Sequence, residues 1–369
     1  MTDERSPYGI GLLLRVIVKG VVLFAACNFL YMLVPPAFVG SISLYNTVIP
    51  GRERFPFANA PTLDNNVTIL NLNTMFASHV VTAPPADDEY RVFFIGDSAT
   101  WGFHLAAAET YTQQINDQDV TLENGQHLRV YNLAFPISSA TKDLVLLEHA
   151  LQYEPDMVMW LVTDLTFVPE RQNMHMIVTH NEDHVETAAD TFSLGIDPFY
   201  EEYTWWDQTL IGQREDLQRL LHLHLYGAAW AGLRADHDVP NSLATPTNDF
   251  DTEQEWFGYQ PGTVIDFWHT DVLEAVMNRP EPIMILVNEP VYIADGENSD
   301  LHYNFNSPRW AYDQYRDLLA TATDDNNWIY YDWWDAIPPD KFIDPLHVKP
   351  PGAQQVSDLL LAAIVEHAE

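Results

Sequence analysis

The stretch RVFFIGDSATWGF, residues 91–103, decides how the rest of the chain is interpreted. An apolar run typical of a buried strand ends abruptly in Gly96-Asp97-Ser98. Ligands of an open parallel sheet bind at the carboxyl ends of its strands, where this serine would stand. Ser98 is therefore either a turn residue that closes the strand or a nucleophile held toward a substrate. The tripeptide alone does not decide; a nucleophile also needs a base, an orienting acid and oxyanion donors.

Strands and helices alternate from residue 91 onward. The predicted strands cover residues 91–95, 128–133, 157–162, 282–287 and 328–331, and the predicted helices cover residues 106–117, 141–152, 308–322 and 351–368. The strand at 157–162 is wholly apolar, as expected of a sheet covered on both faces. Because strands separated by helices pair in parallel, we predict a three-layer α/β/α sandwich.

Two regions do not follow this alternation. Residues 35–88 form a lead-in segment with little periodicity. Residues from about 165 to 280 are too many for an ordinary connection and include Trp205-Trp206. We therefore predict one domain over residues 89–369 that carries an inserted cap at about 165–280.

Residues 10–34 predict a transmembrane anchor. The segment is nearly all apolar, with Arg15 and Lys19 only in its first half, and about 20 residues span a bilayer. Basic residues gather on its N-terminal side, so the positive-inside bias places residues 1–9 in the cytoplasm and the remainder outside. We expect an uncleaved signal anchor in the cytoplasmic membrane. A buried core helix and a lipoprotein cleavage site before Cys27 are the alternatives.

The chain is strongly acidic. Its 53 acidic and 17 basic residues give a net charge of −36. Such a surface repels phosphate backbones, which excludes nucleic acid as a partner. The acid excess fits a salt-rich habitat and a solvated acidic exterior equally well. A single cysteine excludes an intrachain disulfide.

No metal and no cofactor are expected. His222 and His224 are two residues apart in a predicted helix, so their side chains point apart. His180 and His184 have helical spacing, but the residues between them lack the order of a zinc protease.

The stretch FIDPLH, residues 342–347, supplies the missing acid and base. Asp344 and His347 lie three residues apart, after the last predicted strand and before the last helix. That spacing on a loop or first turn lets the carboxylate and the imidazole face the same strand ends. Asp344 can then hold the tautomer of His347, and His347 can serve Ser98 as general base.

The GDS motif after the first strand, together with DxxH before a closing helix, resembles the SGNH or GDSL hydrolase superfamily. The resemblance covers about residues 89–164 and 281–368. It implies a flavodoxin-like parallel sheet and a catalytic triad of Ser98, His347 and Asp344.

Two further sequence blocks of that family are altered in this chain. The second block normally brings a glycine whose N–H enters the oxyanion hole beside Ser98. Its counterpart YNLAFPISSATKDL has no glycine, so Ala134 or Ser138 would provide the donor. The third is normally Gly-x-Asn-Asp, and its counterpart LVTD has Thr163 in place of Asn and keeps Asp164. Losing an oxyanion donor typically costs ~10²–10³ in rate. Three interpretations stay open: a tolerated loss, a Thr163 hydroxyl that substitutes, and decay into a binding role.

Two classes of function stay open. The first is a serine acyl hydrolase or O-acyltransferase outside the cytoplasmic membrane. For it, the resemblance implies ester groups of cell-envelope or exopolysaccharide carbohydrate as substrate and a multi-pass O-acyltransferase as candidate partner. The second is a catalytically decayed envelope protein that binds glycan or scaffolds a membrane complex. Trp205-Trp206 fits sugar stacking, the membrane interface or core packing, and Asn288-Glu289-Pro290 fits a strand-ending turn or a ligand edge.

Overall fold

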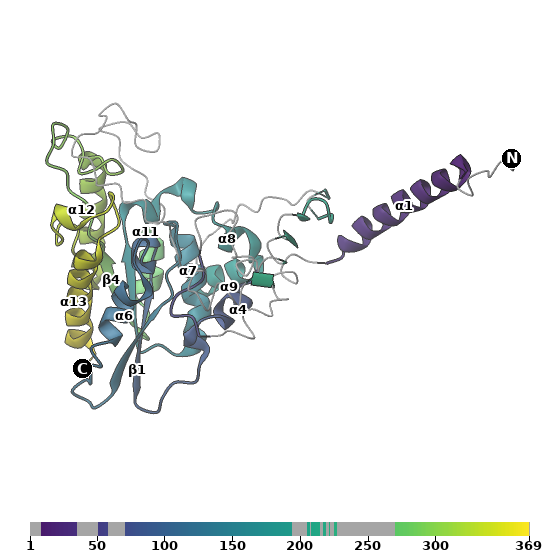
Figure 1. Ribbon diagram of the computed structural model, residues 1–369. Helices are drawn as coiled ribbons and strands as arrows, with labels where there is room; N and C mark the ends of the chain where they lie inside the picture. Colours follow the sequence, from purple (N-terminus) through teal and green to yellow (C-terminus); the bar gives the residue numbers. More distant parts are fainter. Residues whose placement is uncertain are drawn as a thin grey trace, which may run out of the picture.

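A computed structural model of the chain describes most of the predicted domain. The described residues are 9–34, 51–57, 71–193 and 270–368, with short pieces at 205–206, 208–214, 217–218, 221 and 225–226. Figure 1 shows a sheet wrapped by helices and one long N-terminal helix that extends away from it.

The sheet is parallel throughout and confirms the predicted fold class. Its strands are β1 (Glu89–Ile95), β2 (His127–Asn132), β3 (Met157–Val162), β4 (Ile283–Asn288) and β5 (Ile329–Asp332). They pair in the order β2-β1-β3-β4-β5. In this doubly wound order the chain leaves β1 toward one edge and later returns to build the other. The crevice at this reversal, between the ends of β1 and β3, is where such sheets bind ligands.

Helices cover both faces of the sheet. Side chains of β3 alternate between two cores: Met159 lies in one, and Trp160 lies in the other. The first core contains α6 (Tyr111–Asn116) and α13 (Pro350–His367), and the second contains α4 (Leu72–Ala77), α7 (Ala140–Ala150), α8 (Met176–His180), α9 (Glu182–Phe192), α11 (Thr270–Met277) and α12 (Arg309–Asn326). The remaining elements are α1 (Ile10–Tyr31), α5 (Ser98–Trp101) and the 3₁₀ turns η2 (Val80–Thr82), η3 (Ala107–Glu109), η4 (Leu151–Tyr153), η5 (Asp164–Phe167), η6 (Pro169–Arg171) and η8 (Pro339–Lys341). The arrangement is the predicted three-layer sandwich.

The helix predicted over 106–117 is divided into η3 and α6. Thr110 between them has an extended backbone, with φ −69° and ψ 153°, and its side chain accepts a hydrogen bond from the N–H of Gln113. An N-cap of this kind starts a new helix rather than continuing the old one.

Part of the region predicted as an insertion lies in the sandwich core. Val185 and Phe192 of α9 and Val276 of α11 share the core of α7. Residues 194–204 and 227–269 lie outside the described residues, as do His222 and His224. The limits of an inserted cap at about 165–280 therefore stay a prediction.

Helix α1 is exposed along its length, apart from the region of Asn28 and Tyr31 at its end. Among the described residues it is the helix long and apolar enough to cross a membrane. Cys27 is exposed on it.

Candidate active site

Ser98 stands at the first turn of the short helix α5, directly after β1. Asp97 caps this helix by accepting a hydrogen bond from the N–H of Ala99 at 2.9 Å. Gly96 is needed here, since a Cβ at this position would lie 2.9 Å from the carbonyl oxygen of Leu161 on β3. The chain therefore turns sharply and presents the Ser98 hydroxyl at a helix N-terminus, where backbone N–H groups have no intrahelical acceptor.

Ser98, His347 and Asp344 form one hydrogen-bonded chain. His347 Nε2 lies 2.9 Å from Ser98 Oγ, and His347 Nδ1 lies 2.7 Å from Asp344 Oδ2. Because a carboxylate only accepts, Nδ1 carries the proton and Nε2 is left to accept from the serine hydroxyl. The three side chains come from two chain regions that the sheet brings to one edge, as the sequence predicts.

The loop itself fixes Asp344. Its Oδ1 accepts hydrogen bonds from the backbone N–H groups of Leu346 at 2.9 Å and His347 at 2.8 Å. Burial alone would raise the pKa of Asp344, but the hydrogen bonds from His347 and from these N–H groups lower it below its ordinary value. The carboxylate is therefore ionised at neutral pH and holds the proton of His347 on Nδ1.

His104 is a second histidine beside the same carboxylate, and no sequence motif points to it. His104 Nε2 lies 3.6 Å from Asp344 Oδ2, and its ring centroid lies 5.7 Å from that of His347. Burial and the neighbouring His347 lower the pKa of His104, so it is neutral at pH 7. The ligand atoms of these three residues lie within 4.8 Å of one another.

The loop that carries His104 is held from behind by the lead-in segment. His104 has a left-handed backbone with φ 67°. The buried guanidinium of Arg54 donates hydrogen bonds to the carbonyl oxygens of Gly102 at 2.9 Å and Leu105 at 3.1 Å. Residues 51–57 are thus part of the support of the site.

Thr163 has an uncommitted hydroxyl. Thr163 directly follows the end of β3. Because β3 pairs with β1 and places Trp160 beside Ile95, Thr163 and Ser98 both follow the ends of neighbouring strands. Its N–H donates to Thr166 Oγ1 at 3.0 Å, whereas its own Oγ1 is buried without a hydrogen-bond partner among the described residues. A buried hydroxyl without a partner is costly in a folded protein.

Of the two residues predicted to replace the family glycine, Ala134 has its backbone N–H engaged, whereas Ser138 forms its described hydrogen bond through its side-chain hydroxyl. The N–H of Ala134 donates to Asn132 Oδ1 at 3.3 Å, and the hydroxyl of Ser138 donates to Asp97 Oδ2. Ile137, the residue before Ser138, was not among the predicted site residues. Its backbone is left-handed with φ 76°, and its side chain is 53% exposed. A left-handed backbone at a β-branched residue is strained by roughly 1–2 kcal/mol, and such strain gathers at functional sites.

The peptide before Ile137 is oriented by a neutral histidine. Nδ1 of His175 accepts from the N–H of Ile177 at 3.0 Å, so its Nε2 carries the proton and donates to the carbonyl of Pro136 at 3.2 Å. Burial lowers the pKa of His175 to about 3, so the ring does not charge. Since the peptide is planar, the N–H of Ile137 points opposite to that carbonyl. This N–H has no hydrogen-bond partner among the described residues.

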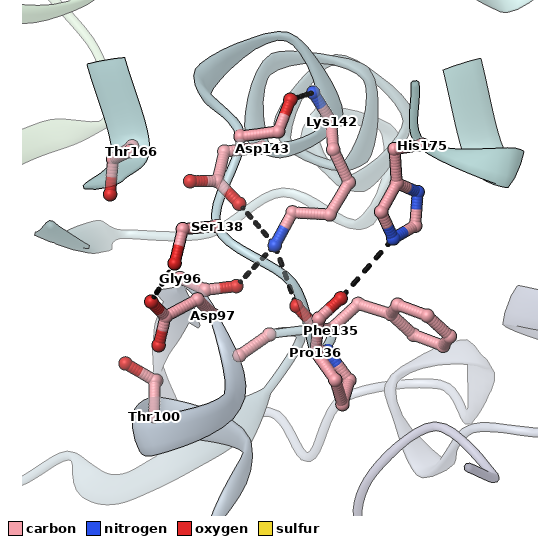
Figure 2. A network of polar contacts seen from close by, with 12 residues as sticks. Gly96, Asp97, Thr100, Phe135, Pro136, Ser138, Lys142, Asp143, Thr166 and His175 are labelled. Atoms are coloured by element: carbon pink, nitrogen blue, oxygen red, sulfur yellow. Dashed lines mark hydrogen bonds and ion pairs between the residues drawn. The ribbon is translucent and has the colours of Figure 1, made fainter. Parts of the chain in front are cut away.

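A fully buried lysine joins this loop to the loop that precedes Ser98 (Figure 2). Lys142 Nζ donates to the carbonyl oxygens of Gly96 at 2.8 Å and Phe135 at 2.6 Å and pairs with Asp143 Oδ1 at 2.8 Å. Asp143 also accepts from Trp160 Nε1 at 3.1 Å. Lys142 therefore fixes both loops that surround Ser98.

Two other acidic groups at the sheet edge are buried beside the site. Asp164 is fully buried, which raises its pKa to about 7, and Ser307 donates to its Oδ2 at 3.4 Å. Glu289 accepts from Thr100 Oγ1 on α5 at 2.6 Å, and burial raises its pKa well above its ordinary value. Glu289 thus supports helix α5 from inside the fold, which is more than the strand-ending turn that the sequence also allowed.

No protein-family model and no curated protein match this sequence. Several solved structures are similar at a low level. A carbohydrate acetylesterase family member from Sinorhizobium meliloti has 12% identity and a TM-score of 0.33, over 74% of this chain and 96% of its own. A putative arylesterase from Agrobacterium tumefaciens has 13% identity and a TM-score of 0.35, over 75% and 98%. A lipase/acylhydrolase from Enterococcus faecalis has 14% identity and a TM-score of 0.37, over 75% and 95%. Likenesses this distant assign no activity. Three features of this chain itself agree with the SGNH pattern. They are the strand order of the sheet, the position of Ser98 after β1, and the positions of Asp344 and His347 before the last helix.

Proposed function

We propose that this protein is a serine acyl hydrolase or O-acyltransferase. The observation that carries the proposal is the chain from Ser98 Oγ through His347 to Asp344, with contacts of 2.9 Å and 2.7 Å. A serine hydroxyl is a weak nucleophile until a neighbouring base removes its proton. The base is His347, whose Nε2 is free to accept the serine proton because its Nδ1 donates to the ionised carboxylate of Asp344.

The reaction proceeds in two transfers. Ser98 Oγ attacks the ester carbonyl carbon while its proton passes to His347 Nε2. The bond from that carbon to the alcohol oxygen then breaks, and His347 returns the proton to the leaving alcohol. Water or a second hydroxyl gives its proton to His347 and attacks the acyl-enzyme. The bond to Ser98 Oγ breaks and the serine recovers its proton.

The negative oxygen of each tetrahedral intermediate needs hydrogen-bond donors. The N–H groups of Ser98 and Ile137 and the hydroxyl of Thr163 are candidates, because none has another partner among the described residues. Donors fixed before the reaction stabilise the developing charge without reorganising. Ile137 is therefore a further candidate for the donor role that the sequence suggested for Ala134 or Ser138, beside the N–H of Ser138, which has no backbone acceptor among the described residues.

The setting of the reaction is also part of the proposal. Helix α1 anchors the chain in the cytoplasmic membrane, with residues 1–9 inside and the domain outside. The acyl acceptor is water or a carbohydrate hydroxyl of the cell envelope, and a multi-pass O-acyltransferase is the candidate acyl donor partner. The main alternative is a decayed protein that only binds glycan. The uncommitted Thr163 hydroxyl beside an intact Ser98–His347 contact favours the enzyme.

Turnover of p-nitrophenyl acetate by the full-length protein tests the enzyme against the binding protein. Ser98→Ala and His347→Ala should each lose at least ~10³-fold in kcat, and Asp344→Ala less, because the base remains. Ser193→Gly, an exposed serine at the end of α9, is the matched control and should keep full activity. Equal rates in all four variants would reject the site. Adding a methyl glycoside and detecting acylated sugar by mass spectrometry separates transfer from hydrolysis.

A further inference from the structure

The described residues between 205 and 226 expose several large apolar side chains. Trp205 is 63% exposed, Trp206 46% and Leu225 70%, and Leu221 and Tyr226 are exposed as well. The tryptophan pair therefore does not pack in the core, which was one of the sequence interpretations. Described parts of this segment lie between α1 and the helices α8 and α9 (Figure 1).

This segment is bonded to the end of α1. Asn28 Oδ1 accepts a hydrogen bond from the N–H of Ile211 at 3.2 Å, and the hydroxyl of Tyr31 donates to Gln213 Oε1 at 3.4 Å. Asn28 is only 8% exposed, unlike its neighbours on the helix. A polar asparagine in the apolar second half of the helix is thus explained by its contact with this segment.

The length of α1 fixes where that contact lies. Its 22 residues span about 33 Å at 1.5 Å per residue, close to the ~30 Å hydrocarbon core of a bilayer. When α1 crosses a membrane, Asn28 and Tyr31 in its last turns lie at the boundary with the headgroups. Ile211 and Gln213, within hydrogen-bond distance, must lie there too.

Local turns keep the tryptophan pair close to this level. The N–H of Thr209 donates to the carbonyl of Trp206 at 3.0 Å, and the N–H of Gln213 donates to that of Thr209 at 2.9 Å. Five residues in helix-like turns rise only about 8 Å. Tryptophan and tyrosine are enriched at this depth of a bilayer, because an apolar ring with a polar edge suits the interface.

We propose that the described residues of the segment 205–226 are a second membrane contact, in which Trp205, Trp206 and Leu225 enter the headgroup region of the leaflet where α1 ends. This inference rests on the proposed anchoring of α1. The occupant is lipid rather than a protein partner because this segment is hydrogen bonded to the end of α1, the helix that is long and apolar enough to cross a membrane. The contact holds the domain in one orientation toward the membrane, instead of on a free tether.

Fluorescence quenching in full-length protein tests this contact. In a Cys27→Ser background, single cysteines at Leu225→Cys, Leu23→Cys and Asp358→Cys carry an environment-sensitive dye, in phosphatidylcholine nanodiscs with spin-labelled lipids. The dye at position 225 should be quenched by lipids labelled near the headgroup, at least about twofold more than the dye at exposed position 358 on α13. The dye at position 23 should be quenched by lipids labelled deep in the chain.

The outcomes separate the two proposals. Quenching at position 23 without quenching at 225 would overturn the second contact and leave the anchor standing. No quenching at position 23 would overturn both. Adding Asn28→Leu keeps α1 apolar but removes the bond to Ile211. It should lower the quenching at position 225 by about half or more while that at 23 persists. Unchanged quenching at 225 in that variant would refute the role of Asn28.

Discussion

Replacing Thr163 by valine should lower activity and raise stability in the same protein. Valine has nearly the same shape but lacks the hydroxyl, which is buried with no hydrogen-bond partner in the described parts of the chain. Removing an unsatisfied buried polar group recovers roughly 1 kcal/mol of the 1–3 kcal/mol that such a group costs. That corresponds to a rise of about 2–4 °C in Tm for a domain of this size. If the hydroxyl binds the oxyanion, kcat should fall by ~10²–10³.

Two assays on purified full-length protein check the expected fall in activity and the expected rise in stability. Thermal unfolding measures Tm, and p-nitrophenyl acetate hydrolysis measures kcat and KM. Thr323→Val on α12 is the matched control, because its Oγ1 is also buried and lacks a partner within the described ranges, but it lies in the last turn of α12, far from Ser98 in the fold. It should gain stability without losing activity. A Thr163→Val protein with kcat within threefold of wild type would refute the role of the Thr163 hydroxyl as an oxyanion donor. A fall in Tm would show that this hydroxyl has a hydrogen-bond partner in the folded protein.

Four further outcomes follow from the site. The lowered pKa of Asp344 contributes stability that is present above the ordinary pKa of 3.8 and is lost as pH falls through the pKa of the folded state. The difference in urea-unfolding free energy between wild type and Asp344→Asn should therefore shrink from neutral pH to about pH 3. A difference that stays constant over this range would contradict the argument. Ile137→Gly should relieve the left-handed strain and add about 1 kcal/mol in urea unfolding with activity retained; a loss of stability would show that the backbone there is not strained. Lys142→Met should destabilise by roughly 3–5 kcal/mol because Asp143 is left buried and unpaired, and Lys142→Met with Asp143→Leu should recover part of it; no recovery in thermal unfolding would count against the pair. His104→Asn should lower kcat roughly tenfold with little change in KM, as for a group that positions a reacting residue; an effect on KM alone would assign it to substrate binding.

The sequence predicted the sheet well because buried parallel strands have an unambiguous pattern. Residues 157–162 are apolar throughout, and β3 has those same bounds. The helix over 106–117 was wrong in its continuity, since the cap formed by Thr110 depends on a backbone geometry that periodicity does not encode. The lead-in residue Arg54 gave no pattern at all, because its partners are backbone carbonyls on a distant loop.

The candidate site was predictable where function requires particular side chains in a particular order. Ser98, Asp344 and His347 were found in this way. His104 was not, since a single loop histidine has no motif and its place depends on a left-handed backbone. A lysine at position 142 of a predicted helix is, by sequence alone, typical of an exposed cation. Only the three-dimensional fold buries its side chain against two carbonyl oxygens.

The most direct test of the account is where and how fast a fluorophosphonate reacts with the protein. Peptide mapping by mass spectrometry should find the adduct on Ser98. The labelling rate should fall by at least ~10³-fold in His347→Ala, because the hydroxyl then lacks its base. An adduct on another residue, or an unchanged rate in His347→Ala, would contradict a nucleophile at Ser98 activated by His347.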